Sequence, residues 1–302
     1  MSNMTEIRYI DRKTGTILTE DTPGERWLRF LYRNPLGKLP LHAFVKRKGL
    51  SALYGRLMDS PRSRAKIAPF VKRYGISMEE SVKSVDAFSS FNDFFSRKLK
   101  ADARPVAGGE ERLVSPADGK ILAFERFSDI GTLFVKGRPL TAAALFGEEE
   151  TAERYREGAL ILIRLAPVDY HRFHFPLAGL PGPAEKIPGA YFSVSPWAVG
   201  ERVSIFCENK RELTLLETKT AGVLAIFEIG ATMVGAVTQT FTPGIAVNKG
   251  REKGYFSFGG STVILVAEKD AVVLDDDLLD NTKKGLETKV LMGEGIGKGL
   301  RL

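Results

Sequence analysis

The chain has 302 residues, of which 43% are hydrophobic and 27% charged, the balance expected of a folded protein with a sizeable core. Its one cysteine, Cys207, excludes an internal disulfide and a metal site built from several cysteines, and indicates a reducing compartment. Residues 1–15 contain no apolar signal-peptide core, and no apolar run approaches the ~18 residues that would span a bilayer.

The formal net charge of +7 is concentrated in one segment, residues 41–75. A single acidic residue, Asp59, opposes the basic residues of this segment, which are Lys46, Arg47, Lys48, Arg56, Arg62, Arg64, Lys66, Lys72 and Arg73. Such a patch favours a polyanionic partner, either nucleic acid or an anionic membrane.

The first part of the chain, from about residue 22 to residue 100, reads as short amphipathic helices. Pro35 and Pro40 interrupt the pattern, and large apolar side chains alternate with Lys and Arg. This composition is typical of helices that lie in a membrane interface, with Trp27, Leu28, Leu31 and Phe44 as candidate apolar wedges. Packing of the same apolar stripe against the protein's own core is an equally open interpretation.

Two helix starts are predicted before the composition changes. Ser77 and Glu80 form a capping box for a helix over 77–87, and Ser90 precedes Asp93 at the start of a second helix. The Pro- and Gly-containing segment 101–110 then predicts a boundary. We therefore divide the chain into a helical, basic, membrane-associating region, 1–108, and a second domain, 109–302.

The second domain is dominated by strand-like runs separated by Gly and Pro turns. The runs are residues 120–127, 132–137, 158–166, 171–176, 202–208, 212–218, 222–231, 233–237, 255–267 and 271–276, with helical interruptions predicted at 141–147 and 148–156. The spacing predicts an α+β fold: N-terminal amphipathic helices followed by a β-rich, mostly antiparallel, sandwich- or barrel-like catalytic domain.

The chain has three histidines, and two of them lie close together. His42 lies in the basic segment, whereas His171 and His174 share the motif Asp169-Tyr-His-Arg-Phe-His-Phe-Pro. On a strand, residues 169, 171 and 173 face one way and residues 172 and 174 the other, so the two imidazoles are expected to have different roles. The motif lacks further His or Cys ligands, so a metal site is not predicted.

A serine interrupts the strand pattern near the C-terminus, in the sequence Gly259-Gly260-Ser261-Thr262. The nucleophile elbow of α/β-hydrolases requires G-x-S-x-G, and residue 263 is Val, so that motif is absent. A β-bulge is one interpretation. By itself, Asp118 reads as an ordinary turn residue. A second interpretation combines Ser261 with a histidine and with Asp118, because such a set can activate a hydroxyl to attack the preceding carbonyl.

Several motifs, in this order, resemble the phosphatidylserine decarboxylase family of the pyruvoyl-dependent, prokaryotic type. They are SPADGKI (115–121), VKG (135–137), DYHRFHFP (169–176), GATMVGAV (230–237) and NKGREKGYFSFGGSTVILV (248–266), and the resemblance covers roughly residues 90–270. The family's cleavage motif is usually Leu-Gly-Ser-Thr, and Gly259 takes the place of the leucine here.

The resemblance implies a self-processing zymogen. Ser261 would attack the carbonyl of Gly260, with His174 as base and Asp118 holding the imidazole, and the chain would separate into residues 1–260 and 261–302. The ester formed from Ser261 would give a covalent pyruvoyl group, which forms a Schiff base with the substrate. His171 would be the acid–base group of decarboxylation, and Asp169 would tune it.

The resemblance further implies a lyase of phospholipid biosynthesis that converts phosphatidylserine to phosphatidylethanolamine. Its partners would be the anionic membrane surface and the two chains of the same precursor, with a homodimer of that heterodimer also expected and no nucleic acid. The expected location is peripheral, on the cytoplasmic face of the cell membrane. Two alternatives stay open from the residues: a lipid hydrolase using the same Ser, His and Asp, and a non-catalytic membrane- or nucleic-acid-binding module.

Overall fold

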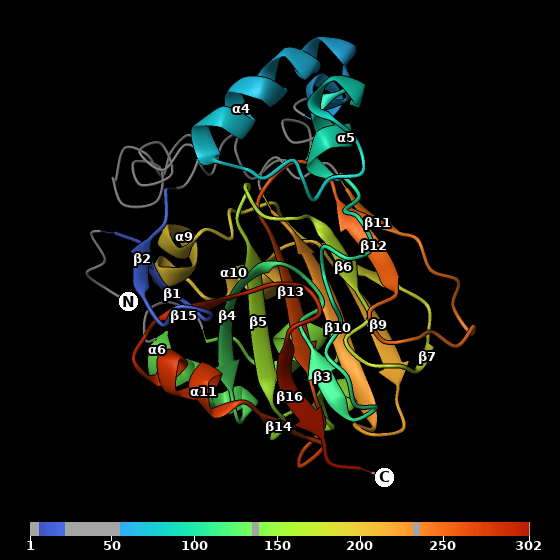
Figure 1. The fold of residues 1–302 in the computed structure, drawn as a ribbon. Coiled ribbons are helices and arrows are strands. Elements are labelled where there is room, and N and C mark those ends of the chain that lie inside the picture. The colour runs from blue at the N-terminus through green and yellow to red at the C-terminus, as the bar shows by residue number, and fades with distance from the viewer. Residues whose placement is uncertain (1–5, 22–54, 135–138, 232–235, 302) are drawn as a thin grey trace.

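The computed structural model describes residues 6–21, 55–134, 139–231 and 236–301. The predicted membrane wedges at Trp27, Leu28, Leu31 and Phe44 lie outside the described residues, as do His42, the VKG motif and residues 232–235. The described chain forms one large sheet covered on both faces, with helices over one end of it (Figure 1).

The large sheet consists of strands from both halves of the chain. They are β1 (Arg8–Asp11), β2 (Ile17–Thr19), β4 (Gly119–Phe124), β5 (Leu160–Leu165), β7 (Leu180–Pro181), β8 (Glu185–Ile187), β9 (Arg211–Glu217), β10 (Val223–Gly230), β13 (Ser261–Val266) and β15 (Glu287–Val290). Their order is β2-β1-β15-β4-β5-β13-β10-β9-β7, with β8 also paired to β9, and only the β1–β15 pair is parallel.

The central strands alternate apolar residues toward both faces, because both faces are covered. On β13, Ile264 and Val266 belong to one core cluster, and Val263 and Leu265 belong to the other. The first face is covered by helices, namely α6 (Ile130–Leu133), α7 (Ala142–Phe146), α8 (Glu149–Glu153), α9 (Pro196–Glu201) and α10 (Ile205–Glu208).

Two three-stranded sheets and one helix cover the second face. One sheet has the order β11-β12-β6, and the other has the order β14-β16-β3. Their bounds, with those of the helix, are β3 (Arg112–Val114), β6 (Arg172–His174), β11 (Val237–Gln239), β12 (Glu252–Phe256), β14 (Val272–Leu274), β16 (Gly295–Gly299) and α11 (Asp276–Lys283). The layers form an open sandwich and none of the sheets closes into a barrel.

A helical cap lies over one end of the sheets. It contains the 3₁₀ helices η2 (Pro61–Lys66) and η3 (Val85–Ala87) and the α-helices α4 (Ile67–Tyr74) and α5 (Phe91–Phe95) (Figure 1). The cap has a phenylalanine-rich core of its own, formed by Met58, Ile67, Phe88, Phe91, Phe94 and Phe95, and Phe258 packs against it. Among the described residues, no helix is both long and apolar enough to cross a membrane.

The predicted fold class is confirmed, since helices precede a β-rich and mostly antiparallel domain. Several local predictions were wrong. Residues 77–87 contain only η3, because Ser81 pairs with Leu99 in an isolated bridge that extends the backbone there. The apolar run at 202–208 was predicted as a strand, but α10 begins within it, and of the run at 132–137 the first two residues belong to α6, while residues 135–137 lie outside the described part; both helices pack on the first face of the sheet.

The first 108 residues also contain strands, which their sequence did not predict. Strand β1 pairs with β2 and with β15, so the N-terminal hairpin completes one edge of the large sheet. Arg164 fixes this edge, because its guanidinium binds the carboxylates of Glu20 and Glu287 in a buried cluster. The division of the chain at residue 108 stays a prediction.

Candidate active site

Three predicted site segments meet at one end of the large sheet. Strand β13 begins at Ser261, whose partners in the register are Leu165 on β5 and Gly230 on β10. Asp118 directly precedes β4, which pairs with β5. Because β4, β5, β13 and β10 are consecutive neighbours, Asp118 and Ser261 lie at the same end of adjoining strands.

The histidine motif lies at the same end of the large sheet as Asp118 and Ser261, because the chain beyond two neighbouring strands of that sheet, β5 and β13, forms a pair of strands in the small sheet. Strand β5 continues into β6 and β12 continues into β13, and β6 pairs with β12 in the small sheet. The Phe256 N–H donates to the His171 carbonyl (3.0 Å), and the His174 N–H donates to the Pro116 carbonyl (2.8 Å). His174 is therefore tied by its backbone to the segment that carries Asp118.

Ser261 occupies the point where the chain passes from the small sheet to the large one. Its side chain is fully buried, and among the described residues its Oγ has no hydrogen-bond partner. The strand pattern is interrupted before it at residues 257–260, where Gly259 has a φ of 143°. That backbone conformation favours glycine, which explains why this position carries no side chain.

His171 is a fully buried, neutral imidazole in contact with the helical cap. Its ring lies 3.9 Å from that of Phe95, and its Nδ1 is 2.9 Å from the Asp169 carbonyl oxygen. Burial lowers the pKa of His171 to about 4. A carbonyl oxygen only accepts, so Nδ1 carries the proton, and the buried Nε2 is left with a free lone pair and no partner in the described chain.

His174 has different surroundings, as strand alternation predicts. Its ring lies 5.9 Å from the ring of Tyr170, and burial lowers its pKa to about 4. Its Nδ1 is buried without a hydrogen-bond partner among the described residues. Both histidines are therefore neutral near pH 7, the protonation state that a general base requires.

Asp118 is engaged by an arginine that the sequence did not single out. Arg104 donates from Nε and Nη2 to the Asp118 carboxylate, at distances down to 2.6 Å, and the Met292 N–H donates to it at 2.8 Å. Within the described ranges no hydrogen bond joins Asp118 to His174 or to Ser261. The structure thus brings the three residues to one end of the sheet without forming a hydrogen-bonded relay.

The carboxylate of Asp169 has a structural partner. Lys120 donates to both Asp169 oxygens, at 2.8 and 3.0 Å, and the Ala166 N–H donates at 2.7 Å. The hydrogen-bond contact of Asp169 with His171 is made by its backbone carbonyl. Asp169 therefore fixes the loop between β5 and β6 and acts on the histidine through its main chain.

Helix α5 packs directly on the predicted cleavage segment, a contact that the sequence did not predict. The Phe258 N–H donates to the Asn92 side-chain oxygen (2.8 Å), and the Phe258 ring lies about 5 Å from those of Phe91 and Phe95. The run of phenylalanines at 88–95 was the only available signal. It predicts a buried helix and does not identify what the helix covers.

Comparison with known proteins identifies the family. A family model described as phosphatidylserine decarboxylase matches residues 91–298. Relatives named phosphatidylserine decarboxylase proenzyme include one from Fusobacterium nucleatum subsp. nucleatum, 50% identical over 98% of both chains. Another, from Clostridium novyi, is 44% identical over 97% of this chain and 100% of the relative, and one from Chlamydia pneumoniae is 44% identical over 99% of both.

The chain belongs to the phosphatidylserine decarboxylase family. The family match begins at Phe91 and so includes α5 and both sheets of the candidate site. The resemblance stated from the motifs is confirmed. The relatives align with nearly the whole chain, including the hairpin β1–β2 and the cap.

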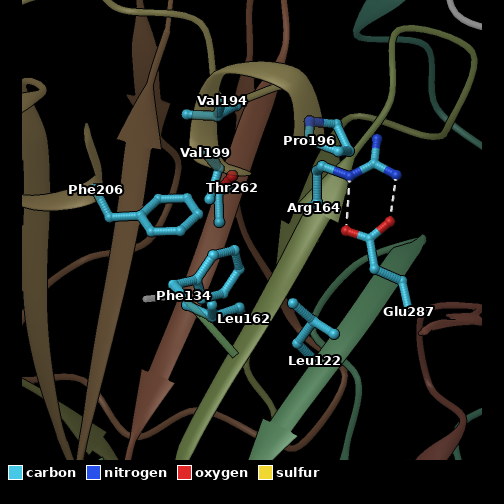
Figure 2. Close-up of a pocket in the computed structure, with 10 residues that line it drawn as sticks. All are labelled: Leu122, Phe134, Leu162, Arg164, Val194, Pro196, Val199, Phe206, Thr262 and Glu287. Carbon is cyan, nitrogen blue, oxygen red and sulfur yellow. Dashed lines mark hydrogen bonds and ion pairs between the residues drawn. The ribbon is translucent and has the colours of Figure 1, made fainter. Parts of the chain in front are cut away.

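A pocket lies on the helix-covered face of strands β4, β5 and β13 (Figure 2). Its lining is mostly apolar and includes Leu122, Leu162, Val194, Val199, Phe134 and Phe206, and Thr262 and the Arg164–Glu287 ion pair also line it. Thr262 follows Ser261 on β13, and successive strand residues point to opposite faces. The pocket therefore lies on the helix-covered face, opposite the side chain of Ser261.

Proposed function

We propose that this chain cuts itself between Gly260 and Ser261 and then decarboxylates phosphatidylserine to phosphatidylethanolamine. The observation that carries the proposal is the Ser261 hydroxyl. It is fully buried, has no hydrogen-bond partner among the described residues, follows two glycines, and lies at the sheet end that it shares with Asp118 and both neutral histidines. Other buried hydroxyls of the described chain, such as those of Thr214 and Thr262, also lack a partner, so the position of Ser261 after the glycines and at this sheet end supports the proposal.

The first step converts a peptide bond into an ester. Ser261 Oγ gives its proton to the imidazole of His174 and attacks the Gly260 carbonyl carbon. The Gly260–Ser261 C–N bond then breaks, and the proton passes to the departing amine. Asp118 supports His174 from the adjacent strand end, where Arg104 and the Met292 N–H hold its carboxylate.

Elimination completes the cut. The α-proton of Ser261 is removed, its Cβ–O bond breaks, and Gly260 leaves as a carboxylate. Uptake of one water and loss of ammonia convert the remaining residue to a pyruvoyl group at the start of β13. The buried, orphaned hydroxyl and the glycine backbone before it fit such a group, which supplies a ketone that captures the substrate amine and accepts the electron pair released with CO₂.

His171 moves the proton of the decarboxylation step in this proposal. Its Nε2 lone pair accepts the proton that the substrate ammonium loses, and the same nitrogen returns it to the carbon that has lost CO₂. Asp169 acts as a positioning residue, because its carbonyl fixes the Nδ1–H tautomer. Its carboxylate bonds to Lys120 hold that carbonyl in place.

The two product chains stay together because the cut separates neighbouring strands of one sheet. After cleavage β13 would belong to the small chain, 261–302, while β5 and β10 on either side belong to the large chain, 1–260. Six register pairs join β13 to each neighbour. A homodimer of this heterodimer stays a prediction.

We further propose that the helical cap binds the anionic membrane surface from the cytoplasmic side. Six basic side chains of its described part are exposed, and none forms an ion pair with another described residue: Arg56, Arg62, Arg64, Lys66, Lys72 and Arg73. The cap covers the cleavage segment, so a membrane bound to it lies at the same end of the molecule as Ser261 (Figure 1).

Electrophoresis under denaturing conditions, with intact-mass measurement, tests the self-processing step. The purified protein is expected as two chains that meet at residues 260 and 261, the smaller one starting with a keto group that borohydride reduces. Ser261→Ala is expected to give one uncut chain without decarboxylase activity. An active, uncut wild-type chain that is insensitive to borohydride would overturn the proposal and favour an ordinary serine hydrolase.

A further inference from the structure

Arg97 is a buried cation without an ion-pair partner among the described residues. It is 6% exposed, and its Nε is buried with no hydrogen-bond partner in that part of the chain. The contact that the structure gives its guanidinium is the ring of Phe94, 5.1 Å away. No carboxylate of the described chain lies within ion-pair distance of it.

The other buried basic side chains of the described residues are all satisfied. Arg104 binds Asp118, Lys120 binds Asp169, Arg172 binds Glu252, Lys253 binds Glu228, Arg164 binds two carboxylates, and Arg211 donates to four backbone carbonyls at Ala144, Leu145, Cys207 and Asn209. An unpaired buried charge is among the most destabilising features that a protein can hold. A position that departs from this pattern therefore calls for a ligand that supplies the missing anion.

Arg97 lies at the candidate active site. It follows α5, and Phe95, two residues earlier, contacts both His171 and Phe258. The Ser96 carbonyl accepts a hydrogen bond from Arg172 of the histidine motif (2.9 Å). The charged and titratable groups that act on Arg97 come from the elements around it: Asp118, Tyr170, Arg104, Asp169 and His171.

We propose that Arg97 binds the phosphodiester of the phospholipid headgroup and so positions the substrate amine at residue 261. The inference rests on the proposed function, which supplies a substrate with a permanent anion. A guanidinium presents two N–H groups in a fork that matches two phosphate oxygens. The pairing would neutralise Arg97 only when substrate or product is bound.

The substrate carboxylate is the less suitable partner for this charge. Its negative charge leaves that group as CO₂ forms, so a cation beside it would stabilise the ground state more than the transition state and would slow the reaction. The phosphodiester keeps its charge from substrate to product. A cation beside it strengthens binding without opposing the chemistry.

The new carboxylate of Gly260 is a second anion that cleavage would create near the site. A side chain built at Gly260 would meet Val194, which precedes α9 on the helix-covered side of the large sheet. The charged groups that act on Arg97 lie instead in the histidine motif, at Asp169 and Tyr170, and just before β4, at Asp118. The surroundings of the two residues thus favour the substrate as the partner of Arg97.

Steady-state kinetics of Arg97→Gln and Arg97→Lys test the proposal in mixed micelles of detergent and dioleoyl phosphatidylserine. For Arg97→Gln we expect KM to rise about 10- to 100-fold, the effect of losing one charge-assisted hydrogen-bonded pair, while kcat changes much less. Arg97→Lys, which keeps the charge, is expected to recover part of the loss in KM. Both variants are expected to cleave at 260/261 as the wild type does.

Product inhibition by dioleoyl phosphatidylethanolamine distinguishes the two anions of the substrate. This product keeps the phosphodiester and lacks the carboxylate, so Arg97→Gln should raise its inhibition constant by about the same factor as KM. A raised KM with an unchanged inhibition constant would assign Arg97 to the carboxylate and overturn the proposal. Unchanged values of both, in an active enzyme, would overturn it while leaving the proposed function intact.

Thermal stability separates a ligand-binding arginine from a structural one. In the uncut Ser261→Ala chain, adding Arg97→Gln removes an unpaired buried charge and is expected to leave the melting temperature unchanged or raise it. The matched control, Arg211→Gln, should lower the melting temperature and, in the cleaved enzyme, leave KM unchanged. If Arg97→Gln lowers the melting temperature only in the cleaved enzyme, Arg97 binds the Gly260 carboxylate. If both Arg97 variants fail to cleave, Arg97 acts in processing. Either result contradicts the proposal.

Discussion

Asp118 and Arg104 form a two-point ion pair at the end of the large sheet, with the Asp118 carboxylate 2.6 Å from Nη2 and 2.9 Å from Nε of the arginine. Both side chains are buried, and the Met292 N–H donates to the same carboxylate. The relationship joins the residue assigned to the processing relay with the segment that follows the cap. We therefore expect the stability of the fold and the rate of self-cleavage to depend on the same carboxylate.

Asp118→Asn is expected to lower the free energy of unfolding by about 3 kcal/mol, the lower end of the cost of breaking a buried ion pair, because Glu80 still neutralises Arg104. Urea denaturation of the uncut Ser261→Ala chain, with and without Asp118→Asn, measures the change. Glu80→Gln is the control, and its more exposed side chain should have a much smaller effect. In the chain with Ser261 intact, Asp118→Asn should slow cleavage; cleavage at the wild-type rate would remove Asp118 from the proposed relay.

The two buried histidines predict a loss of stability below neutral pH. Their pKa is lowered to about 4 in the folded chain and is near 6.5 when unfolded, so between these values the unfolded state binds more protons. The stabilising effect is complete above pH 6.5 and is lost as pH falls toward 4, by up to about 1.4 kcal/mol per pH unit for each histidine. Unfolding of the Ser261→Ala chain at a series of pH values measures it.

The Ser261→Ala chain is compared with the same chain carrying His171→Asn. This comparison separates the contribution of His171 to the pH dependence of stability from that of the carboxylates that titrate in the same range. The difference in the free energy of unfolding between the two should vary with pH between 6.5 and 4 and become constant below 4. A difference independent of pH would show that His171 is not held neutral by burial. The rate of self-cleavage should likewise stay high from pH 8 to about 5, because the base is already neutral.

The two glycines before Ser261 are expected to respond differently to substitution. Gly259 has a φ of 143°, which L-residues rarely adopt, whereas a Cβ at Gly260 would lie 3.7 Å from the Val194 side chain, an ordinary contact. In the Ser261→Ala chain, Gly259→Ala should lower the free energy of unfolding by about 1–3 kcal/mol and Gly260→Ala by much less. Equal losses for the two variants would contradict the assigned backbone conformation.

The basic face of the cap is expected to bind anionic vesicles. Reversing three exposed charges, Lys66→Glu, Lys72→Glu and Arg73→Glu, should weaken binding to phosphatidylserine-containing vesicles by at least about 100-fold at low salt, since each lost charge removes about 1 kcal/mol and each new carboxylate repels the surface. Sedimentation with vesicles measures binding. Substitution is preferable to deleting the N-terminal region, because β1 and its neighbour β2 form part of the large sheet.

The same charge change placed elsewhere controls for net charge. Lys269→Glu alters an exposed side chain shortly before β14, and Lys283→Glu and Lys284→Glu alter exposed side chains at the end of α11; both elements lie away from the cap (Figure 1). Vesicle binding by this variant should stay close to that of the wild type, and both triple variants should still cleave. Equal weakening in the two variants would assign binding to net charge alone and contradict a role for the cap.

The sequence by itself determined the family and the β-rich class of the fold, and it singled out Ser261 as the candidate reacting serine. These are local properties: the strands at 158–166 and 222–231 follow from uninterrupted apolar runs, and Ser261 is recognisable from its glycines and from the motifs around it. The same local rules failed at 202–208, where an apolar run forms α10 because it packs on the sheet from outside. Periodicity does not distinguish a short buried strand from a short buried helix.

Only the tertiary structure decided which side chains meet at the end of the sheet where that serine lies. Two contacts join segments that are separated in the chain: the ion pair of Asp118 with Arg104 and the ring contact of Phe95 with His171. The same packing leaves the Nε of Arg97 without a hydrogen-bond partner among the described residues. Charge and hydrogen bonding act over a few ångströms in space, whatever the separation in sequence. Whether a buried charge has a partner is therefore fixed by how the sheets and the cap pack.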